Sequence, residues 1–395
     1  MRTMLIRIRR TNLIKYLYKL LFIIVGTLPK KSNVVVFESF LGKQYSCNPR
    51  AIYEKLTSDF PGFTCYWSVD PKYLSRFGEY DLNVLPRFSL RWLLVMARAK
   101  YWVSNSRLPL WVPKPYKTVY LQTWHGTPLK KLGVDIEEVH MPGTNTENYK
   151  KNFTSESNRW DYLISPNDYS TEIFTRAFRF KGEIIKSGYP RNDYLIHSSG
   201  DDVRKIKSSM GIPNNKKVIL YAPTWRDNEY HKRGQYKFSL MLDLEKMHKE
   251  LGQEYIILLR LHYLVADQVD LSDYEGFVVD ASNHTDIREL YVISDLLLTD
   301  YSSVFFDYAI LKRPMIFFVY DIENYRDNLR GFYFNFEEEA PGPLVKDTDE
   351  VIGTIKGITN TKLKSDRQKF NEYASRFVHL EDGNATSRVI EKVFK

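Results

Sequence analysis

Cysteine is scarce in this sequence, with Cys47 and Cys65 the only two among 395 residues. Two cysteines are too few for a disulfide framework or for a zinc site built from cysteine thiolates. Such low usage is typical of proteins that work in a reducing compartment. We therefore expect a cytoplasmic protein with no disulfide framework and no zinc site built from cysteine.

Long apolar runs are also missing. The uncharged apolar run nearest the N-terminus, residues 20–28, has nine residues, whereas about 20 are needed to span a bilayer. No small-residue cleavage site follows this run, and a predicted strand begins soon after it, which excludes a typical signal peptide. We expect no transmembrane helix in this region.

Basic charge is concentrated at the N-terminus. Of the 57 Lys and Arg residues, eight lie within residues 1–31, which contain no Asp or Glu. The other 49 are nearly balanced by 48 acidic residues, so the net charge of +9 does not indicate a nucleic-acid-binding surface. Basic residues interleaved with apolar ones predict an amphipathic helix on an anionic membrane surface, formed by residues 1–32. The alternative is a helix packed on the protein with its lysines in solvent.

From residue 33 onward, short β-rich segments alternate with longer helical patterns, which predicts βα units on parallel sheets. Several of these segments are almost entirely apolar, as strands covered on both faces should be. The expected strands are 34–38, 64–69, 101–104, 118–123, 162–165, 184–187, 217–222, 255–260, 277–279, 295–299 and 314–319.

The polar stretch at residues 198–217 separates the two halves of this pattern. We therefore predict two doubly wound, Rossmann-like domains that face each other across a cleft, residues 33–190 and 191–395.

Common catalytic motifs are absent. The sequence contains no GxGxxG, GxxxxGK[ST], GxSxG or HExxH motif. What it has instead are polar residues directly after predicted strands, where the ligand crevice of an α/β protein opens. The stretches are LQTWHGTPLKKLG (121–133), KSGYPRND (186–193), KKVILYAPTWRD (216–227), YIILLRLHYL (255–264) and DLLLTDYSSVFFDYAILKRP (295–314).

The first stretch places His125 and Gly126 in a tight turn after a strand. Thr127 and Pro128 suit the start of a helix, and Gly133 suits its end, so we expect a short helix between them. A lone histidine in such a turn can be a buried structural residue or a catalytic one. The other strand ends favour the catalytic interpretation.

The stretch at 295–314 places Ser302 and Ser303 where a helix begins. Hydroxyl groups and free backbone N–H groups at a helix start can bind phosphate. Asp307, one turn later on the same face, could accept hydrogen bonds from a sugar or glycerol hydroxyl. The alternative is a serine that caps the helix and an Asp at the surface.

Together these stretches, with GTNTENY, RWDYLISPNDYST and RGFYFNFEEEAPGP, resemble the CDP-glycerol glycerophosphotransferase family of wall teichoic acid synthesis. The resemblance runs from about residue 34 to the C-terminus. The chain is similar to the short family members that have a single catalytic module. It implies a glycosyltransferase-B-like fold and the transfer of glycerol phosphate from CDP-glycerol to an undecaprenyl-diphosphate-linked teichoic acid acceptor. It also implies release of CMP and work at the cytoplasmic face of the membrane.

The resemblance also implies roles for individual residues. His125 is the expected base for the acceptor hydroxyl, and His262 with Arg260 is expected to contact the donor diphosphate. The residues expected to line the donor site are Trp124, Gly126, Thr127, Pro128, Arg191, Pro223, Thr224, Ser302, Ser303 and Asp307. Neither a cofactor nor a metal is expected.

Three functions remain open at this stage. The first is a transferase that adds glycerol phosphate to a glycerol-phosphate-primed lipid, which Lys130 and Lys131 favour because they could bind phosphates of a primed acceptor. The second is a related enzyme, either a primase that acts on the unprimed lipid-linked disaccharide or a transferase on the same fold that uses CDP-ribitol or a nucleotide sugar. The third is a catalytically silent membrane-peripheral protein that binds an anionic polymer.

Overall fold

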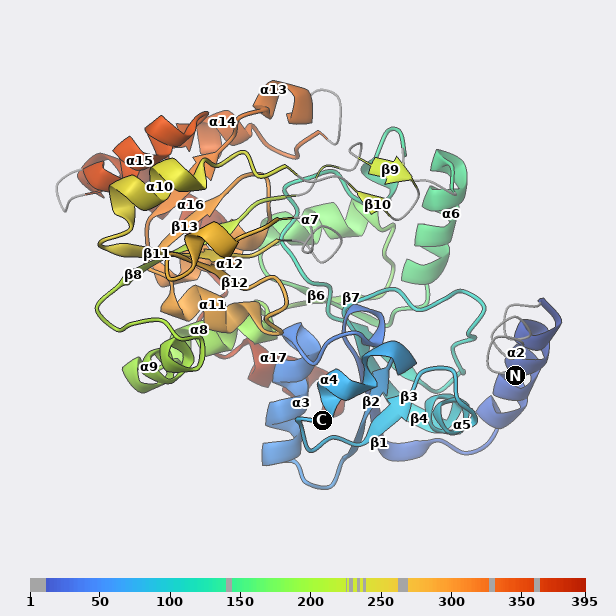
Figure 1. Cartoon of the computed structure of the whole chain (residues 1–395). Coiled ribbons are helices and arrows are strands. Elements are labelled where there is room, and N and C mark those ends of the chain that lie inside the picture. The colour runs from blue at the N-terminus through green and yellow to red at the C-terminus, as the bar shows by residue number, and fades with distance from the viewer. Residues whose placement is uncertain are drawn as a thin grey trace.

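The computed structural model describes residues 12–139, 144–224, 226, 230–232, 235–236, 239–261, 269–326, 331–358 and 363–395. The chain forms two α/β domains that lie against each other, each built around one parallel sheet (Figure 1). Trp225 and His262 lie outside the described residues.

The N-terminal sheet has seven strands in the order β3-β2-β1-β4-β5-β6-β7, and every neighbouring pair is parallel. The strands are β1 (Lys31–Glu38), β2 (Thr64–Val69), β3 (Val84–Pro86), β4 (Ala99–Ser104), β5 (Val119–Gln122), β6 (Tyr162–Ser165) and β7 (Glu183–Lys186). The helical segments of this domain are α2 (Asn12–Gly26), η1 (Phe40–Gly42), α3 (Cys47–Asp59), η2 (Pro71–Tyr73), α4 (Leu74–Phe77), α5 (Leu90–Arg98), η3 (Gly133–Asp135), α6 (Thr146–Ser157) and α7 (Asp168–Ala177).

The C-terminal sheet has six parallel strands in the order β12-β11-β8-β13-β14-β15. The strands are β8 (Lys217–Ala222), β11 (Tyr255–Leu259), β12 (Val278–Asp280), β13 (Leu296–Thr299), β14 (Met315–Phe318) and β15 (Leu344–Val345), and β9 (Tyr230–Lys232) pairs with β10 (Gln235–Tyr236) in a separate ribbon. The helical segments are η4 (Pro190–Asn192), α8 (Asp193–His197), α9 (Gly200–Ser209), α10 (Leu244–Leu251), η6 (Ser272–Tyr274), α11 (Ile287–Ile293), α12 (Val304–Tyr308), η7 (Ala309–Leu311), α13 (Ile322–Asn324), α14 (Phe336–Glu339), α15 (Thr348–Gly357), α16 (Leu363–Phe377) and α17 (Ala385–Phe394).

All eleven strands expected from the sequence are present, with some ends shifted by a few residues. The strands that were not expected are β3, β9, β10 and β15. Each is two or three residues long, which is too short for an alternation of apolar and polar residues to predict a strand. In each main sheet the order of the first six strands along the chain is 3-2-1-4-5-6, the arrangement of a doubly wound nucleotide-binding domain. The predicted pair of Rossmann-like domains is therefore confirmed.

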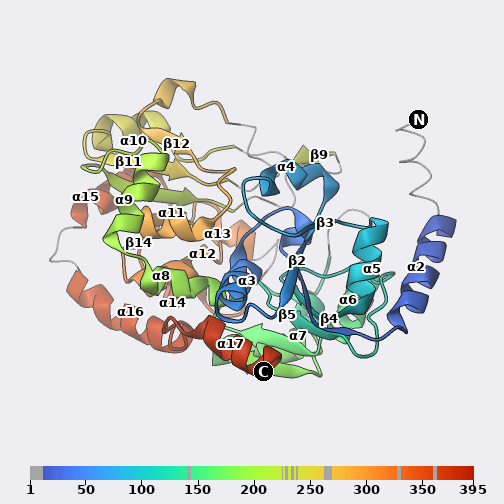
Figure 2. The same ribbon diagram turned by 90° about the horizontal axis from the view of Figure 1, so that it is seen from below.

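The last helix departs from the expected domain division. Helix α17 does not stay with the C-terminal sheet but packs on the N-terminal domain (Figure 2). Its Val389 and Ile390 lie in one core cluster with Val35 of β1, and the ring of Phe394 is 4.8 Å from that of Tyr101. The chain therefore crosses between the domains twice. The apolar face of α17 is buried against the N-terminal domain, which explains the second crossing.

The helix predicted after Thr127 does not form. Residues 123–129 are irregular, and the first helical segment that follows is the short turn η3. The backbone between Leu129 and Lys131 instead pairs with the C-terminal domain, through Tyr333 N to Leu129 O (2.9 Å) and Lys131 N to Gly331 O (3.3 Å). These backbone groups obtain partners across the domain interface, so a local helix is not needed to satisfy them.

Helix α2 lies at the edge of the N-terminal domain that is far from the C-terminal domain (Figures 1 and 2). One stripe of it is buried, since Phe22 and Val25 join the core cluster that contains Trp92 and Trp102. The remaining surface is unusually apolar. The large hydrophobic side chains exposed along this helix and just after it are Leu13, Tyr16, Leu17, Leu20, Leu21, Ile23, Ile24 and Leu28. No helix within the described residues is long and apolar enough to cross a membrane.

Candidate active site

The predicted site residues lie at the carboxyl ends of strands in both domains. His125 follows β5, Thr224 follows β8, Arg260 follows β11, and Ser302 and Ser303 follow β13. These ends lie beside the points where the strand order reverses, which is where doubly wound sheets bind ligands. The remaining predicted residues accompany these: Trp124, Gly126, Thr127 and Pro128 in the turn after β5, Pro223 after β8, Arg191 in η4 and Asp307 in α12.

The His125 ring is held in a defined tautomer. Its Nδ1 lies 2.8 Å from the main-chain oxygen of Asn105, which follows β4. A carbonyl can only accept a hydrogen bond, so Nδ1 carries the proton and Nε2 has a free lone pair. The ring also stacks on Trp124 at 4.8 Å and meets the edge of Phe40 at 5.6 Å. These contacts leave Nε2 as the nitrogen able to take a proton.

The surroundings of His125 keep it neutral at physiological pH. The side chain is accessible to solvent, yet protein surrounds it closely enough that lost hydration lowers its pKa to about 4. The hydrogen bond to Asn105 opposes this shift, and the positive charge of Arg191 adds to it. A neutral imidazole with a free Nε2 can act as a general base.

Two parts of the site meet at Gly126 and Ser303. A Cβ built on Gly126 would lie 3.0 Å from the Ser303 hydroxyl oxygen, although the two residues belong to different domains. Ser303 immediately precedes α12, as predicted, but its side chain does not cap the helix. The Ser303 hydroxyl is thus placed beside the turn that carries His125 and is not used to cap α12.

Arg191 and Asp307 bind each other. The Arg191 guanidinium donates from Nε (3.0 Å) and Nη2 (2.7 Å) to Asp307 Oδ2, and Asn192 donates to Oδ1 of the same carboxylate at 3.1 Å. Both charged side chains are almost completely buried. Their predicted contact with the donor remains untested, but in this structure their polar groups serve the junction between the domains.

Arg260 organises a loop of the C-terminal domain. Its Nη1 lies within 2.7 Å of the carbonyl oxygens of Ala281, Ser282 and His284. Burial lowers the pKa of Arg260, but a guanidinium stays protonated at physiological pH. Arg260 thus brings a positive charge to the strand-end edge while it fixes the loop that leads to α11.

A second buried cluster fixes the ends of β8, β13 and β14. Arg226 pairs with Asp300 at 3.0 Å and with Asp321 at 2.8 Å, and Thr224 N donates to Asp300 at 2.9 Å. The Thr224 hydroxyl is buried and has no hydrogen-bond partner among the described residues. Both carboxylates share the single charge of Arg226, so this cluster orders the strand ends and supplies no net positive charge for an anionic ligand.

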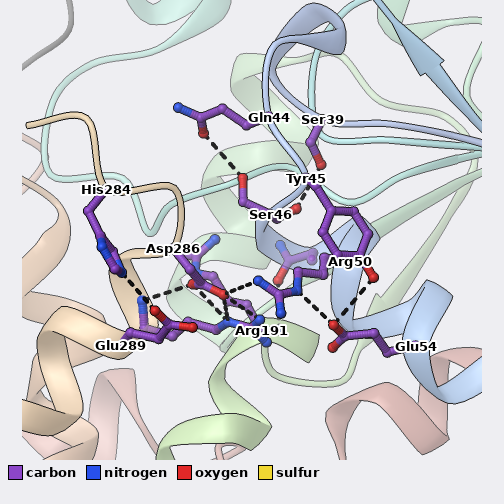
Figure 3. A network of polar contacts seen from close by, with 12 residues as sticks. Ser39, Gln44, Tyr45, Ser46, Arg50, Glu54, Arg191, His284, Asp286 and Glu289 are labelled. Atoms are coloured by element: carbon purple, nitrogen blue, oxygen red, sulfur yellow. Dashed lines mark hydrogen bonds and ion pairs between the residues drawn. The ribbon is translucent and has the colours of Figure 1, made fainter. Parts of the chain in front are cut away.

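The two domains are also joined by ion pairs, which Figure 3 shows from close by. Arg50 of α3 donates to Asp286, the N-cap residue of α11, at 2.9 Å. Arg50 also pairs with Glu54 of its own helix, and Arg288 pairs with Asp286. This network links helix α3 of the N-terminal domain to the loop that Arg260 organises.

Sequence patterns did not reveal two buried asparagines that hold the site. Asn105 supplies the carbonyl for His125, and its side chain accepts a hydrogen bond from Phe40 N at 2.8 Å. Asn48 donates to the carbonyl oxygens of Thr123 (3.2 Å) and Trp124 (3.1 Å). Asn105 follows a predicted strand, which was a usable signal, whereas nothing in the sequence connects Asn48 with residue 124.

Within the described residues, no group of three or more His, Cys, Asp or Glu side chains could hold a metal ion. The two lysines considered for acceptor binding have partners: Lys131 forms an ion pair with Glu137, and Lys130 lies over the ring of Tyr325. These contacts weaken the argument from the lysines for a primed acceptor.

Comparisons with known proteins identify relatives of the whole chain. The family model described as "CDP-Glycerol:Poly(glycerophosphate) glycerophosphotransferase" matches residues 20–395. A teichoic acid poly(glycerol phosphate) polymerase of Bacillus subtilis is 58% identical over 98% of this chain, which spans about half (52%) of that relative. A protein of the same description from Bacillus spizizenii is 54% identical, with 97% of each chain covered.

The structure of the wall teichoic acid polymerase TagF superimposes with a TM-score of 0.88 at 43% identity, covering 98% of this chain and 94% of that one. With a family model and relatives that cover nearly all of its length, this chain belongs to the CDP-glycerol:poly(glycerophosphate) glycerophosphotransferase family.

Proposed function

We propose that this protein transfers glycerol phosphate from CDP-glycerol to the terminal hydroxyl of a lipid-linked, glycerol-phosphate-primed teichoic acid acceptor and releases CMP. The observation that carries the proposal is the bond from His125 Nδ1 to the Asn105 carbonyl, which leaves Nε2 unprotonated at the meeting point of the two domains. The names of the relatives support the choice of glycerol phosphate and of a primed chain.

In the proposed reaction, His125 Nε2 takes the proton of the acceptor hydroxyl. At the same time, the oxygen of this hydroxyl attacks the phosphorus that bears the glycerol. A new oxygen–phosphorus bond forms, and the bond from this phosphorus to the bridging oxygen of the diphosphate breaks. CMP leaves with the bridging oxygen. Phosphoryl transfer of this kind depends mainly on positioning and on stabilising the negative charge of the phosphate oxygens.

The C-terminal domain supplies groups suited to that charge. Ser302 and Ser303, at the start of α12, offer hydroxyl and backbone N–H groups to a phosphate. Arg260 brings a positive charge to the same edge of the sheet, and His262, which lies outside the described residues, remains predicted to contact the donor diphosphate. Because Arg191 and Asp307 are paired, we assign them the task of placing α12 and not of binding the donor.

The test is product analysis with defined substrates. The protein is incubated with CDP-glycerol and a primed, short-chain lipid acceptor, and the products are identified by mass spectrometry. We expect glycerol phosphate additions in the wild type, a loss of at least about 10²-fold in His125→Ala, and losses in both turnover and donor affinity in His262→Ala. Near-normal turnover in His125→Ala would disprove the role of the base.

The same assay separates the alternatives. Faster reaction with CDP-ribitol would identify a ribitol transferase, and preference for the unprimed disaccharide lipid would identify a primase. Polymer binding without turnover, unaffected by either histidine substitution, would identify the catalytically silent protein. We expect none of these three results.

We further propose that helix α2 attaches the protein to the cytoplasmic face of the membrane. Its large exposed side chains form an apolar surface, which α5 extends with Leu90 (68% exposed) and Leu94 (51% exposed). Contiguous exposed apolar surface of this kind marks an interaction site. Lys30 and Arg98 lie beside this surface. Burial lowers the pKa of Lys30, and the nearby charge of Arg98 lowers it further. Cations next to apolar side chains suit an anionic lipid surface.

Vesicle binding tests the attachment. Replacing Leu17 and Ile24 by Gln should weaken binding to anionic vesicles without changing turnover on a short-chain acceptor. The matched control replaces Ile196 and Met241, which are comparably exposed but lie in the C-terminal domain, and should bind as the wild type does. Unchanged vesicle binding by the Leu17/Ile24 variant would disprove the attachment surface.

A further inference from the structure

Asn48 connects the turn that carries His125 with the crossing between the domains. It is completely buried, and its Nδ2 donates to the carbonyl oxygens of Thr123 and Trp124, directly before His125. Its Oδ1 accepts a hydrogen bond from Arg191 N at 3.1 Å. All the hydrogen-bonding groups of the side-chain amide therefore serve two segments that are distant in sequence.

The turn that Asn48 holds is strained. Trp124 has φ of +51°, in the left-handed region that a bulky side chain rarely adopts. Such conformations persist at functional sites only when neighbouring groups fix them. The bond from Asn48 to the Trp124 carbonyl is one such constraint, and the bond from Trp124 N to the Gln122 side chain (3.0 Å) is another.

The contacts continue from Arg191 to helix α12 within the C-terminal domain. The Arg191 side chain pairs with Asp307 in α12, and Ser303, which immediately precedes that helix, lies against Gly126. The path therefore closes on itself, from the His125 turn through Asn48, Arg191 and α12 back to the residue after His125. We call this closed set of contacts the positioning ring: Asn48, Trp124, Gly126, Arg191, Ser303 and Asp307.

We infer that Asn48 is a positioning residue that sets where His125 stands relative to the serines before α12. The inference rests on the proposed role of His125 as the base. Asn48 touches no reacting group; it acts by holding the backbone on both sides of the domain crossing. A displacement of about 1 Å between a base and its substrate can cost on the order of 10²-fold in rate, so such a residue affects turnover more than donor binding.

Asn48→Asp tests the inference with almost no change in shape. An ionised carboxylate cannot donate, so it would place oxygen atoms against two carbonyl oxygens. We expect kcat to fall by about 10-fold or more, with little change in the KM for CDP-glycerol. In the double variant Asn48→Asp/His125→Ala, the loss should equal that of His125→Ala alone, since Asn48 acts through the base.

Asn167 provides the matched control. It lies in the same domain, is completely buried, and its Nδ2 likewise donates to a main-chain carbonyl, that of Phe377 at 2.8 Å. Asn167→Asp should lower the melting temperature and leave kcat of the folded enzyme unchanged. If Asn48→Asp fails to fold, Asn48→Ser, which keeps one donor, is measured in the same way.

The outcomes distinguish the two proposals. Near-normal turnover in His125→Ala would overturn the proposed function. A large loss in His125→Ala together with wild-type kcat in the Asn48 variants would overturn the positioning role alone. If the losses in kcat multiply in the double variant, Asn48 acts independently of His125, and the positioning role is likewise overturned.

Discussion

Arg50 and Asp286 form an ion pair across the domain interface, with Arg50 Nη1 2.9 Å from Asp286 Oδ2 (Figure 3). The Asp286 carboxylate is almost completely buried, and Arg288 donates to both of its oxygens. Burial by itself would raise the pKa of Asp286, but the charges of Arg288 and Arg50 hold it below its ordinary value. The carboxylate therefore remains ionised and joins two arginines from different domains.

Substitutions of Asp286 and of Arg50 should lower the free energy of unfolding by different amounts. Asp286→Asn leaves the buried Arg288 without its carboxylate and close to Arg50, and we expect a loss of about 3–5 kcal/mol in the free energy of unfolding. Arg50→Gln leaves Asp286 paired with Arg288, so it should cost less than half as much. Urea unfolding of both variants measures the difference, and equal losses would contradict this account of the cluster.

The lowered pKa of His125 predicts the pH dependence of the reaction. In the folded protein this pKa is about 4, against an ordinary value of 6.5, so the base stays unprotonated as the pH falls through 6.5. We expect the acidic limb of kcat/KM to lie well below pH 6, because that limb reports the free enzyme. A limb centred near 6.5 would show that the ring is as well hydrated as a free imidazole.

The same shift affects stability with a definite sign. Between pH 6.5 and about 4 the unfolded chain binds a proton at residue 125 that the folded protein does not. Stability should therefore decrease as the pH falls through this window. His125→Ala removes this contribution, so the difference in melting temperature between the variant and the wild type should shift in favour of the variant as the pH is lowered. No pH dependence of that difference would contradict the shift.

The contact between Gly126 and Ser303 predicts a substitution and its rescue. A methyl group at residue 126 would lie 3.0 Å from the Ser303 hydroxyl oxygen and would push that hydroxyl from its place. Gly126→Ala should therefore raise the KM for CDP-glycerol, as should Ser303→Ala. The double variant should be no worse than Ser303→Ala, because the clash disappears with the hydroxyl. Multiplied losses in steady-state kinetics would show that the two residues act separately.

Helix α2 should contribute to stability as well as to attachment. Phe22 is buried against the rings of Trp92 (6.1 Å) and Trp102 (6.3 Å). Phe22→Ala should cost about 3–5 kcal/mol in the free energy of unfolding, measured by chemical denaturation. The exposed Leu17→Ala in the same helix is the control and should cost much less. A chain that starts at residue 32 should be destabilised for the same reason, so substitutions test attachment better than truncation does.

Local patterns were sufficient for most of the fold. Apolar runs such as residues 217–222 and 255–259 predict strands because a strand covered on both faces needs apolar side chains throughout. The polar residues after those strands predicted where the candidate site lies, because the carboxyl ends of parallel strands meet at one edge of each sheet. The helix expected after Thr127 was wrong because its backbone finds partners in residues 331–333 of the other domain, which no local pattern records.

The sequence by itself determined the two parallel sheets, the strand-end stretches and the family, since each depends on residue types in local order. Only the tertiary structure decided which groups meet. It pairs His125 with the Asn105 carbonyl and Arg191 with Asp307, bonds Asn48 to the turn that carries His125, and packs α17 on the first domain. The physical reason is that a hydrogen bond or ion pair requires atoms within about 3 Å. Residues 48, 124, 191 and 307 are distant in sequence, and folding alone brings their polar groups within that distance.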